Sequence, residues 1–173
     1  MRLLRTVVLS ALLVCTASLW AQKTSVDWDR STNFSQFKTF EWIHQPQGSG
    51  FWQQRAVEMV NAQLAAKGLR QVSSNADLAV SLNGATRTQR DLNTFYSGMG
   101  GWGWYGMGGG TATTTEHVYQ VGTLVLDFFN GHTRKLVWRG IAQDSISDKP
   151  EKNQKKLTKA IDKLMKKYPP EQK

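Results

Sequence analysis

The chain has 173 residues, of which 40% are hydrophobic, and its formal net charge is +9. This length suits one domain with a sizeable core and is short for two. The positive charge is concentrated near the C-terminus, where residues 148–173 hold nine lysines against four acidic residues. Attraction to anionic lipid or to envelope polymers would explain this excess, but we favour the solvated face of a helix. We expect no nucleic-acid partner.

Residues 1–21 have the features of a signal peptide. Arg2 and Arg5 make a basic start, an apolar or small-residue run occupies positions 6–19, and Ala21 is the small residue preferred at a cleavage site. The run is shorter than the ~20 apolar residues that span a bilayer. We therefore expect cleavage after Ala21, one mature domain over residues 22–173, and a periplasmic or secreted location.

Cys15 is the only cysteine, and it lies inside the predicted signal peptide. Cleavage after Ala21 would leave the mature protein without a thiol for a disulfide, a nucleophile or a metal ligand. In an alternative interpretation, residues 12–15 form a lipoprotein box and a lipidated Cys15 anchors the protein to a membrane. Val14 argues against this alternative, because the residue before a lipidated cysteine is normally small.

Hydrophobic periodicity predicts an α+β fold. Segments that alternate polar with apolar residues are predicted strands: 25–29, 39–43, 76–93, 111–127 and 136–141. Segments with apolar residues at helical spacing are predicted helices: 51–67, which Gly68 ends, and 150–168, which begins at Pro150. We expect an antiparallel sheet with both helices packed on one face.

Finer features of the fold are also predicted from local sequence. The dipeptide Asn130-Gly131 favours a tight type I′ turn and an antiparallel hairpin. Alternation places Leu136 and Trp138 on one side of the last strand. Tryptophans within strand patterns are expected in the core: Trp28, Trp42 and Trp138.

The string GWGWYG within residues 97–110 matches the dinucleotide-binding pattern G-x-G-x-x-G letter for letter. A true site of this kind follows a buried strand and opens a helix, whose N-terminal N–H groups bind the pyrophosphate. Here a polar segment, 86–91, precedes the glycines, and β-favouring residues 111–115 follow them. We interpret the match as coincidental and expect no nucleotide cofactor.

The same segment is better explained as the flexible, glycine-rich tip of a long hairpin formed by residues 76–93 and 111–127. Ordering many glycines costs conformational entropy. Aromatic side chains on this tip could insert into a membrane interface or stack on a sugar or peptide, and the candidate binding residues are Trp102, Trp104 and Tyr105. The alternative is a low-complexity insertion with no specific role.

No residue pattern indicates catalysis or metal binding. The three histidines, His44, His117 and His132, lack the spacing of metal ligands, and no serine lies in a nucleophile motif. Asp127 and Asp144 could act as a carboxylate pair only if the fold placed both in one cleft. We therefore predict no catalytic residue, no metal and no cofactor.

Several short motifs, in order, resemble a known family. They are NFSQFKTFEW at 33–42, ADLAV at 76–80, GTLVLD at 122–127 and LVWRG at 136–140. Their order is similar to that of the bacterial envelope family catalogued as domain of unknown function 4136. The resemblance implies an exported protein, often a lipoprotein, with a glycine and aromatic insertion in the middle. It implies no activity.

Two hypotheses of function follow. The first is a non-enzymatic, exported envelope domain that binds or scaffolds through its aromatic loop or its open sheet face, with a membrane surface or an envelope polymer as the partner. The second is a hydrolase or other enzyme whose active site no motif reveals. A cleft that holds Asp127, Asp144 or a histidine would favour the second. The sequence predicts no oligomeric state.

Overall fold

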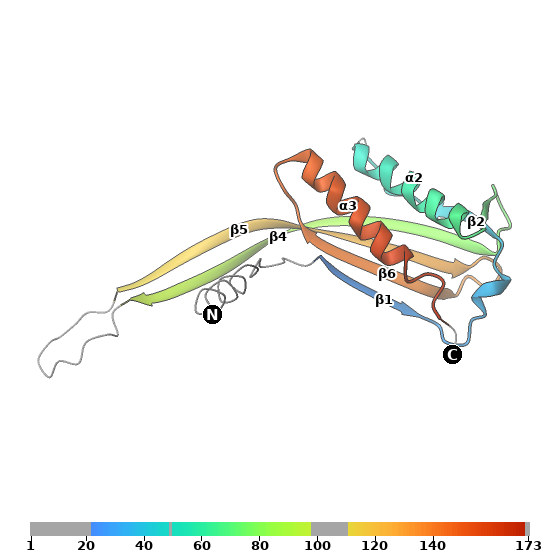
Figure 1. The fold of residues 1–173 in the computed structure, drawn as a ribbon, viewed down its shortest axis with the longest axis horizontal. Coiled ribbons are helices and arrows are strands. Elements are labelled where there is room, and N and C mark those ends of the chain that lie inside the picture. The colour runs from blue at the N-terminus through green and yellow to red at the C-terminus, as the bar shows by residue number, and fades with distance from the viewer. Residues whose placement is uncertain (1–21, 49, 98–110, 172–173) are drawn as a thin grey trace, which may run out of the picture.

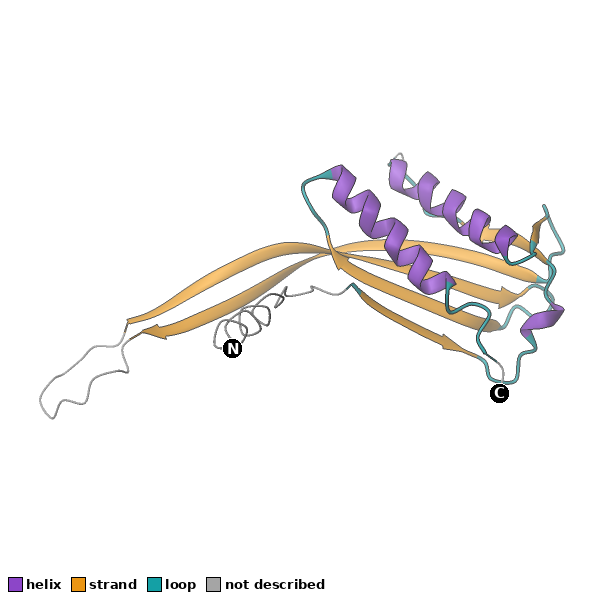
Figure 2. Ribbon diagram, viewed as in Figure 1, coloured by secondary structure: helices purple, strands orange, loops and turns teal. Residues whose placement is uncertain are grey.

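The computed structural model describes residues 22–48, 50–97 and 111–171, with the side chains at 93–97 and 111–113 excepted. It contains a six-stranded sheet with two long helices on one face (Figures 1 and 2). The elements in chain order are β1 (Lys23–Trp28), the 3-10 helix η1 (Phe34–Gln36), β2 (Thr39–His44), α2 (Phe51–Ala66), β3 (Arg70–Gln71), β4 (Leu78–Ser97), β5 (Thr111–Asn130), β6 (Leu136–Ser145) and α3 (Pro150–Met165).

The sheet is mixed, so the expectation of a purely antiparallel sheet was wrong. Its strand order is β1-β6-β5-β4-β2-β3, and β2 runs parallel to both β3 and β4. Helix α2 follows β2 and crosses over one face of the sheet before the chain enters β4, and such a crossover brings the next strand back in the parallel direction. The pairs β1–β6, β4–β5 and β5–β6 are antiparallel.

The connection from β5 to β6 is longer than the predicted type I′ turn. It comprises residues 131–135, and the left-handed position is Arg134 (φ 59°), not Asn130 or Gly131. The Gly131 amide donates a hydrogen bond to the Asp77 carbonyl oxygen at 2.7 Å. A Cβ at Gly131 would overlap the Ala76 carbonyl oxygen. Glycine is therefore required here for a close backbone approach, which the Asn-Gly pattern did not predict.

A bulge changes which side chains of β6 face the helices. Phe128 pairs with Trp138 but Phe129 pairs with Leu136, so Val137 is the extra residue. Leu136 is 39% exposed, whereas Val137 and Trp138 are buried. The prediction that Leu136 shares the covered side with Trp138 was wrong, because alternation fails at a bulge.

The core lies between the helices and the covered face of the sheet. Helix α2 buries Ala56, Val60 and Leu64, and α3 buries Ile161 and Leu164, as the helical spacing predicted. Gly68 follows α2 with φ +84°. Helix α3 ends at Met165, earlier than expected, but Tyr168 beyond it is still buried.

Trp138 is at the centre of this core, as predicted. Its ring stacks on Phe128 at a centroid distance of 4.9 Å and meets Tyr168 edge-on at 5.6 Å. Trp28 and Trp42 are only partly buried and pack against the periphery of the core. The indole N–H of Trp42 donates to Asn61 Oδ1 at 2.8 Å.

Asp77 joins the β1–β2 connection to the start of β4. One carboxylate oxygen, Oδ2, accepts hydrogen bonds from the Lys38 amide at 2.8 Å, the Thr39 amide at 2.9 Å and the Thr39 hydroxyl at 2.9 Å. These bonds, the Lys38 amide first, hold the pKa of Asp77 below its usual value of 3.8 despite partial burial, which acts in the opposite direction.

The lowered pKa of Asp77 predicts a contribution to acid unfolding. A depressed carboxyl pKa stabilises the fold above the unfolded-state pKa, and this stability is lost as the pH falls through the folded-state pKa. We expect Asp77→Asn to flatten the fall in the free energy of unfolding between about pH 4 and pH 2. Urea denaturation across this range is the measurement, and an unchanged slope would contradict the assigned hydrogen bonds.

Candidate functional site

Strands β4 and β5 extend well beyond the rest of the sheet. They pair without interruption from Leu78 and Asn130 to Ser97 and Thr111. The pairing of β2 with β4 ends at Ser81, and that of β6 with β5 ends at Val121. The remainder, residues 88–97 and 111–120, is a two-stranded ribbon that projects from the domain and is called the arm below (Figure 1).

Polar contacts within the arm hold its two strands together. The Tyr119 hydroxyl donates to Asp91 Oδ2 at 2.8 Å, and this hydrogen bond raises the pKa of Tyr119. On the other face, Arg90 forms an ion pair with Glu116 at 3.5 Å. Leu92 and Val118 are paired with Glu116 and Arg90 respectively, so they lie on that same face, and they are 68% and 57% exposed.

The predicted binding residues Trp102, Trp104 and Tyr105 lie outside the described residues. They belong to the segment that links the end of β4 to the start of β5. The match of GWGWYG to a dinucleotide pattern lies in the same segment. It follows β4 and precedes β5, so the segment joins two strands and does not open a described helix.

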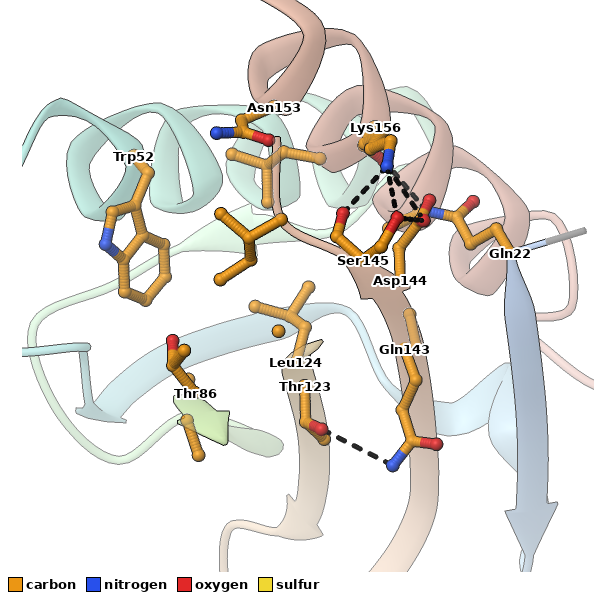
Figure 3. Close-up of a pocket in the computed structure, with 17 residues that line it drawn as sticks. Gln22, Trp52, Thr86, Thr123, Leu124, Gln143, Asp144, Ser145, Asn153 and Lys156 are labelled. Carbon is orange, nitrogen blue, oxygen red and sulfur yellow. Dashed lines mark hydrogen bonds and ion pairs between the residues drawn. The ribbon is translucent and has the colours of Figure 1, made fainter. Parts of the chain in front are cut away.

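A second feature is a cavity of about 290 Å³ between the start of α2, the helix α3 and the sheet, at the base of the arm. We call it the helix–sheet cavity (Figure 3). Its walls include the apolar side chains Trp52, Leu124, Ala142, Ile146, Leu157 and Ala160. Trp52 and Ile146 are 39% and 37% exposed, so the cavity is open to solvent beside them.

Two glycines form part of the sheet side of the cavity. A Cβ at Gly84 would overlap the Trp52 ring, and a Cβ at Gly122 would lie 3.4 Å from Ile146. Gly84 pairs with Leu124 and Gly122 pairs with Thr86, so all four lie on the helix-covered face. The absence of side chains at Gly84 and Gly122 lets the Trp52 ring and the Ile146 side chain approach the sheet, and both of these line the cavity.

The opposite end of the cavity is polar. The Lys156 ammonium lies 3.1 Å from Asp144 Oδ1 and donates to the carbonyl and hydroxyl oxygens of Ser145 at 2.7 and 2.8 Å (Figure 3). Gln22 Nε2 donates to the Lys156 carbonyl at 2.9 Å, while Gln22 Oε1 is buried and receives no hydrogen bond within the described chain. The side chains of Thr123 and Gln143 point away from the cavity.

The two candidate carboxylates do not meet. Asp127, 5% exposed, accepts two hydrogen bonds from Arg139, at 2.6 and 2.7 Å, on the face of the sheet away from the helices. This pairing raises the pKa of Arg139. Asp144 is paired across from Gly122 on the helix-covered face. The sheet separates the two carboxylates, so they cannot act on one substrate as a pair.

The histidines are also dispersed. His44 ends β2, His117 lies in the arm and His132 follows β5, where its Nε2 lies 3.9 Å from Asp77 Oδ1. Among the described residues, no three histidine, cysteine, aspartate or glutamate side chains gather closely enough to hold a metal ion.

Sequence reasoning named Asp144 but missed the cavity around it. The available signal was Gly84 and Gly122 within strand patterns, since glycine inside a strand often marks a close approach or an open space. Lys156 was assigned to the solvated lysine face of α3, although its ammonium lies against Ser145.

The fold and these two features define an α+β domain with a mixed sheet, a helical layer on one face and a projecting two-stranded arm. The chain belongs to the family described as domain of unknown function (DUF4136), whose model matches residues 24–170. The resemblance drawn from the sequence motifs is therefore confirmed. No curated protein matches the sequence significantly.

The solved structures that match the chain share little sequence with it. A PDZ domain protein from Parabacteroides distasonis has a TM-score of 0.53 and 13% identity, and the match covers 88% of this chain but only 36% of that protein. The PelC dodecamer from Paraburkholderia phytofirmans has a TM-score of 0.47 and 13% identity, with 84% and 96% covered. A putative neuraminyllactose-binding hemagglutinin homologue from Helicobacter pylori has a TM-score of 0.43 and 10% identity, with 78% and 86% covered.

The part of the chain that the structure describes contains no helix long and apolar enough to span a membrane.

Proposed function

We propose that this protein is an exported, non-enzymatic domain of the cell envelope that binds or scaffolds through its arm. The observation that supports the proposal is the extension of β4 and β5 beyond every other strand of the sheet. Export is inferred from the basic and apolar residues of positions 1–21, with cleavage after Ala21.

A two-stranded ribbon that no further strand flanks is thermodynamically unfavourable by itself. Isolated hairpins are marginally stable in water, and strand edges expose unpaired backbone groups. Both outer edges of the arm lack a neighbouring strand among the described residues. A partner that covers one face or edge of the arm would stabilise it, which favours a contact role over a purely internal one.

The expected partner is a membrane surface, and an envelope polymer is the alternative. Leu92 and Val118 give one face of the arm two exposed apolar side chains beside the Arg90–Glu116 pair. The segment that follows β4 adds Trp102, Trp104 and Tyr105, and aromatic residues of this kind favour the boundary between water and lipid. These three residues stay candidate contacts.

Substitution of the exposed apolar pair tests the proposal. We expect Leu92→Ser together with Val118→Ser to weaken co-sedimentation of the mature protein with phosphatidylethanolamine–phosphatidylglycerol vesicles at least about fivefold, because each substitution removes apolar area from the contact. Ile43→Ser is the matched control, since Ile43 is a similarly exposed apolar residue on β2 in the body of the domain. If the parent protein, the double variant and the Ile43→Ser control bind the vesicles equally, this face of the arm is not the membrane contact.

A further inference from the structure

We infer that the helix–sheet cavity binds a single aliphatic chain whose polar end donates a hydrogen bond, such as a hydroxyl, an amide N–H or an ammonium. This site is separate from the arm face, and the inference does not depend on the proposed function.

The walls and size of the cavity favour one apolar chain. Its volume of about 290 Å³ is just below the range for small-molecule sites, which begins at about 300 Å³. Trp52, Ile146 and Leu157 line it from α2, the β6–α3 connection and α3, and Leu124 and Ala142 line it from the sheet. An apolar chain that enters beside the exposed Trp52 and Ile146 would remove apolar surface from water on both partners.

The polar end of the cavity offers acceptors and no free cationic donor. All three N–H groups of Lys156 are accounted for by Asp144 Oδ1 and by the two oxygens of Ser145. The amides of Asn153 and Gln22 each use one N–H, for the Ser147 carbonyl oxygen at 2.7 Å and the Lys156 carbonyl oxygen at 2.9 Å, and these donors are neutral. By contrast, Asp144 Oδ2 and Gln22 Oε1 accept no hydrogen bond from the described residues.

Because this end of the cavity has unpaired acceptors but no free cationic donor, it favours a head group that donates a hydrogen bond. A donor placed between Asp144 and Gln22 would pair with the partly exposed Asp144 Oδ2 or with the buried, otherwise unpaired Gln22 Oε1, which is favourable. A carboxylate or phosphate would bring negative charge to Asp144 and would have to displace Ser145 from Lys156 to reach a cationic donor. The charge of Lys156 is already balanced by Asp144, so it provides no net attraction for an anion.

Matched ligands of one chain length test the head group. Isothermal titration calorimetry with octan-1-ol should give saturable binding to protein that keeps Ala21, so that Gln22 carries no terminal ammonium, and octanoate should bind at least about fivefold more weakly, the effect of about one hydrogen bond. Butan-1-ol should bind at least about tenfold more weakly than octan-1-ol, because the shorter chain buries less apolar area.

Variants test the location. Ala142→Leu should abolish octan-1-ol binding by filling the cavity, while the matched control Ala62→Leu, at an exposed position of α2 that does not line the cavity, should retain it. If Ala142→Leu does not fold, Ala160→Met, which fills the cavity from α3, is the variant to use in the same measurement. Asp144→Asn removes the acceptor charge and leaves Lys156 unbalanced, so it should reduce or invert the preference for octan-1-ol over octanoate.

Three results would overturn the inference. The first is the absence of saturable octan-1-ol binding, and the second is undiminished binding by a folded cavity-filling variant. The third is binding of octanoate as tight as that of octan-1-ol, or a preference that Asp144→Asn leaves unchanged, either of which would refute the donor head group.

Discussion

Trp138→Ala is expected to lower the free energy of unfolding by about 3–5 kcal/mol, as truncations of large buried aromatic residues do. Trp138 has no exposed surface, and it packs between Phe128, Tyr168 and the Leu164 side of α3. The substitution would leave a void where the sheet meets α3. Urea denaturation of the mature protein is the measurement.

Two control variants show whether the loss of stability is specific to Trp138 or follows from any substitution in β6. Leu136→Ala, two residues earlier and 39% exposed, should cost less than about 1 kcal/mol, because surface substitutions have small effects. Trp138→Phe should cost less than the alanine variant, since it keeps an aromatic ring and removes the indole N–H, which is buried without an acceptor. A loss below about 1 kcal/mol for Trp138→Ala would show that Trp138 is not central to the core.

Shortening the arm is expected to have little effect on stability. Thr88 and Gln120 are directly paired, so an Asn-Gly turn can join them in place of residues 89–119. The deletion removes the Tyr119–Asp91 and Arg90–Glu116 contacts, none of which involves the core. We expect the free energy of unfolding to stay within about 1 kcal/mol of the parent, because loop-closure entropy varies slowly with length.

A loss of several kcal/mol on shortening the arm would mean that the arm stabilises the domain. The unfolding transition should also stay cooperative in the shortened protein, because the core cluster is confined to the helical layer and the covered sheet face. A broadened transition would contradict this separation of the arm from the body.

The elements of the fold were predictable because most of them keep one hydrophobic period from end to end. The stripe of α2, with Ala56, Val60 and Leu64, and the buried Leu78, Val80 and Leu82 of β4 are examples. The parallel pairing of β2 with β4 was not predicted, because strand periodicity is the same in either direction and only the position of the crossover helix decides it.

Local backbone detail was less predictable. The bulge at Val137 shifts the side chains of β6 by one residue, which no alternation pattern reveals in advance. Gly131 fits a tight turn by sequence, yet the structure uses it for contact with the Ala76 and Asp77 backbone. Such approaches involve residues distant in the chain, so a local pattern does not contain them.

The helix–sheet cavity was not predicted because it depends on the space that several elements leave between them. Trp52 lies in the first turn of α2, Gly84 and Gly122 lie in different strands, and Lys156 lies in α3. Each is unremarkable in its own segment. The antiparallel pairing of β4 with β5, in contrast, joins two long strand patterns that lie on either side of the glycine-rich segment, and the aromatic contacts assigned to that segment stay a prediction.

The most direct test of the proposed function is fractionation of cells that express the parent protein or the variant with the shortened arm. The account predicts that the parent sediments with the membrane fraction and that the variant, although folded and exported, appears in the soluble periplasmic or secreted fraction. Circular dichroism of the purified variant and the mass of its N-terminus establish folding and export. A folded, exported variant that still sediments with membranes to the same extent as the parent would contradict the proposal that the arm makes the envelope contact.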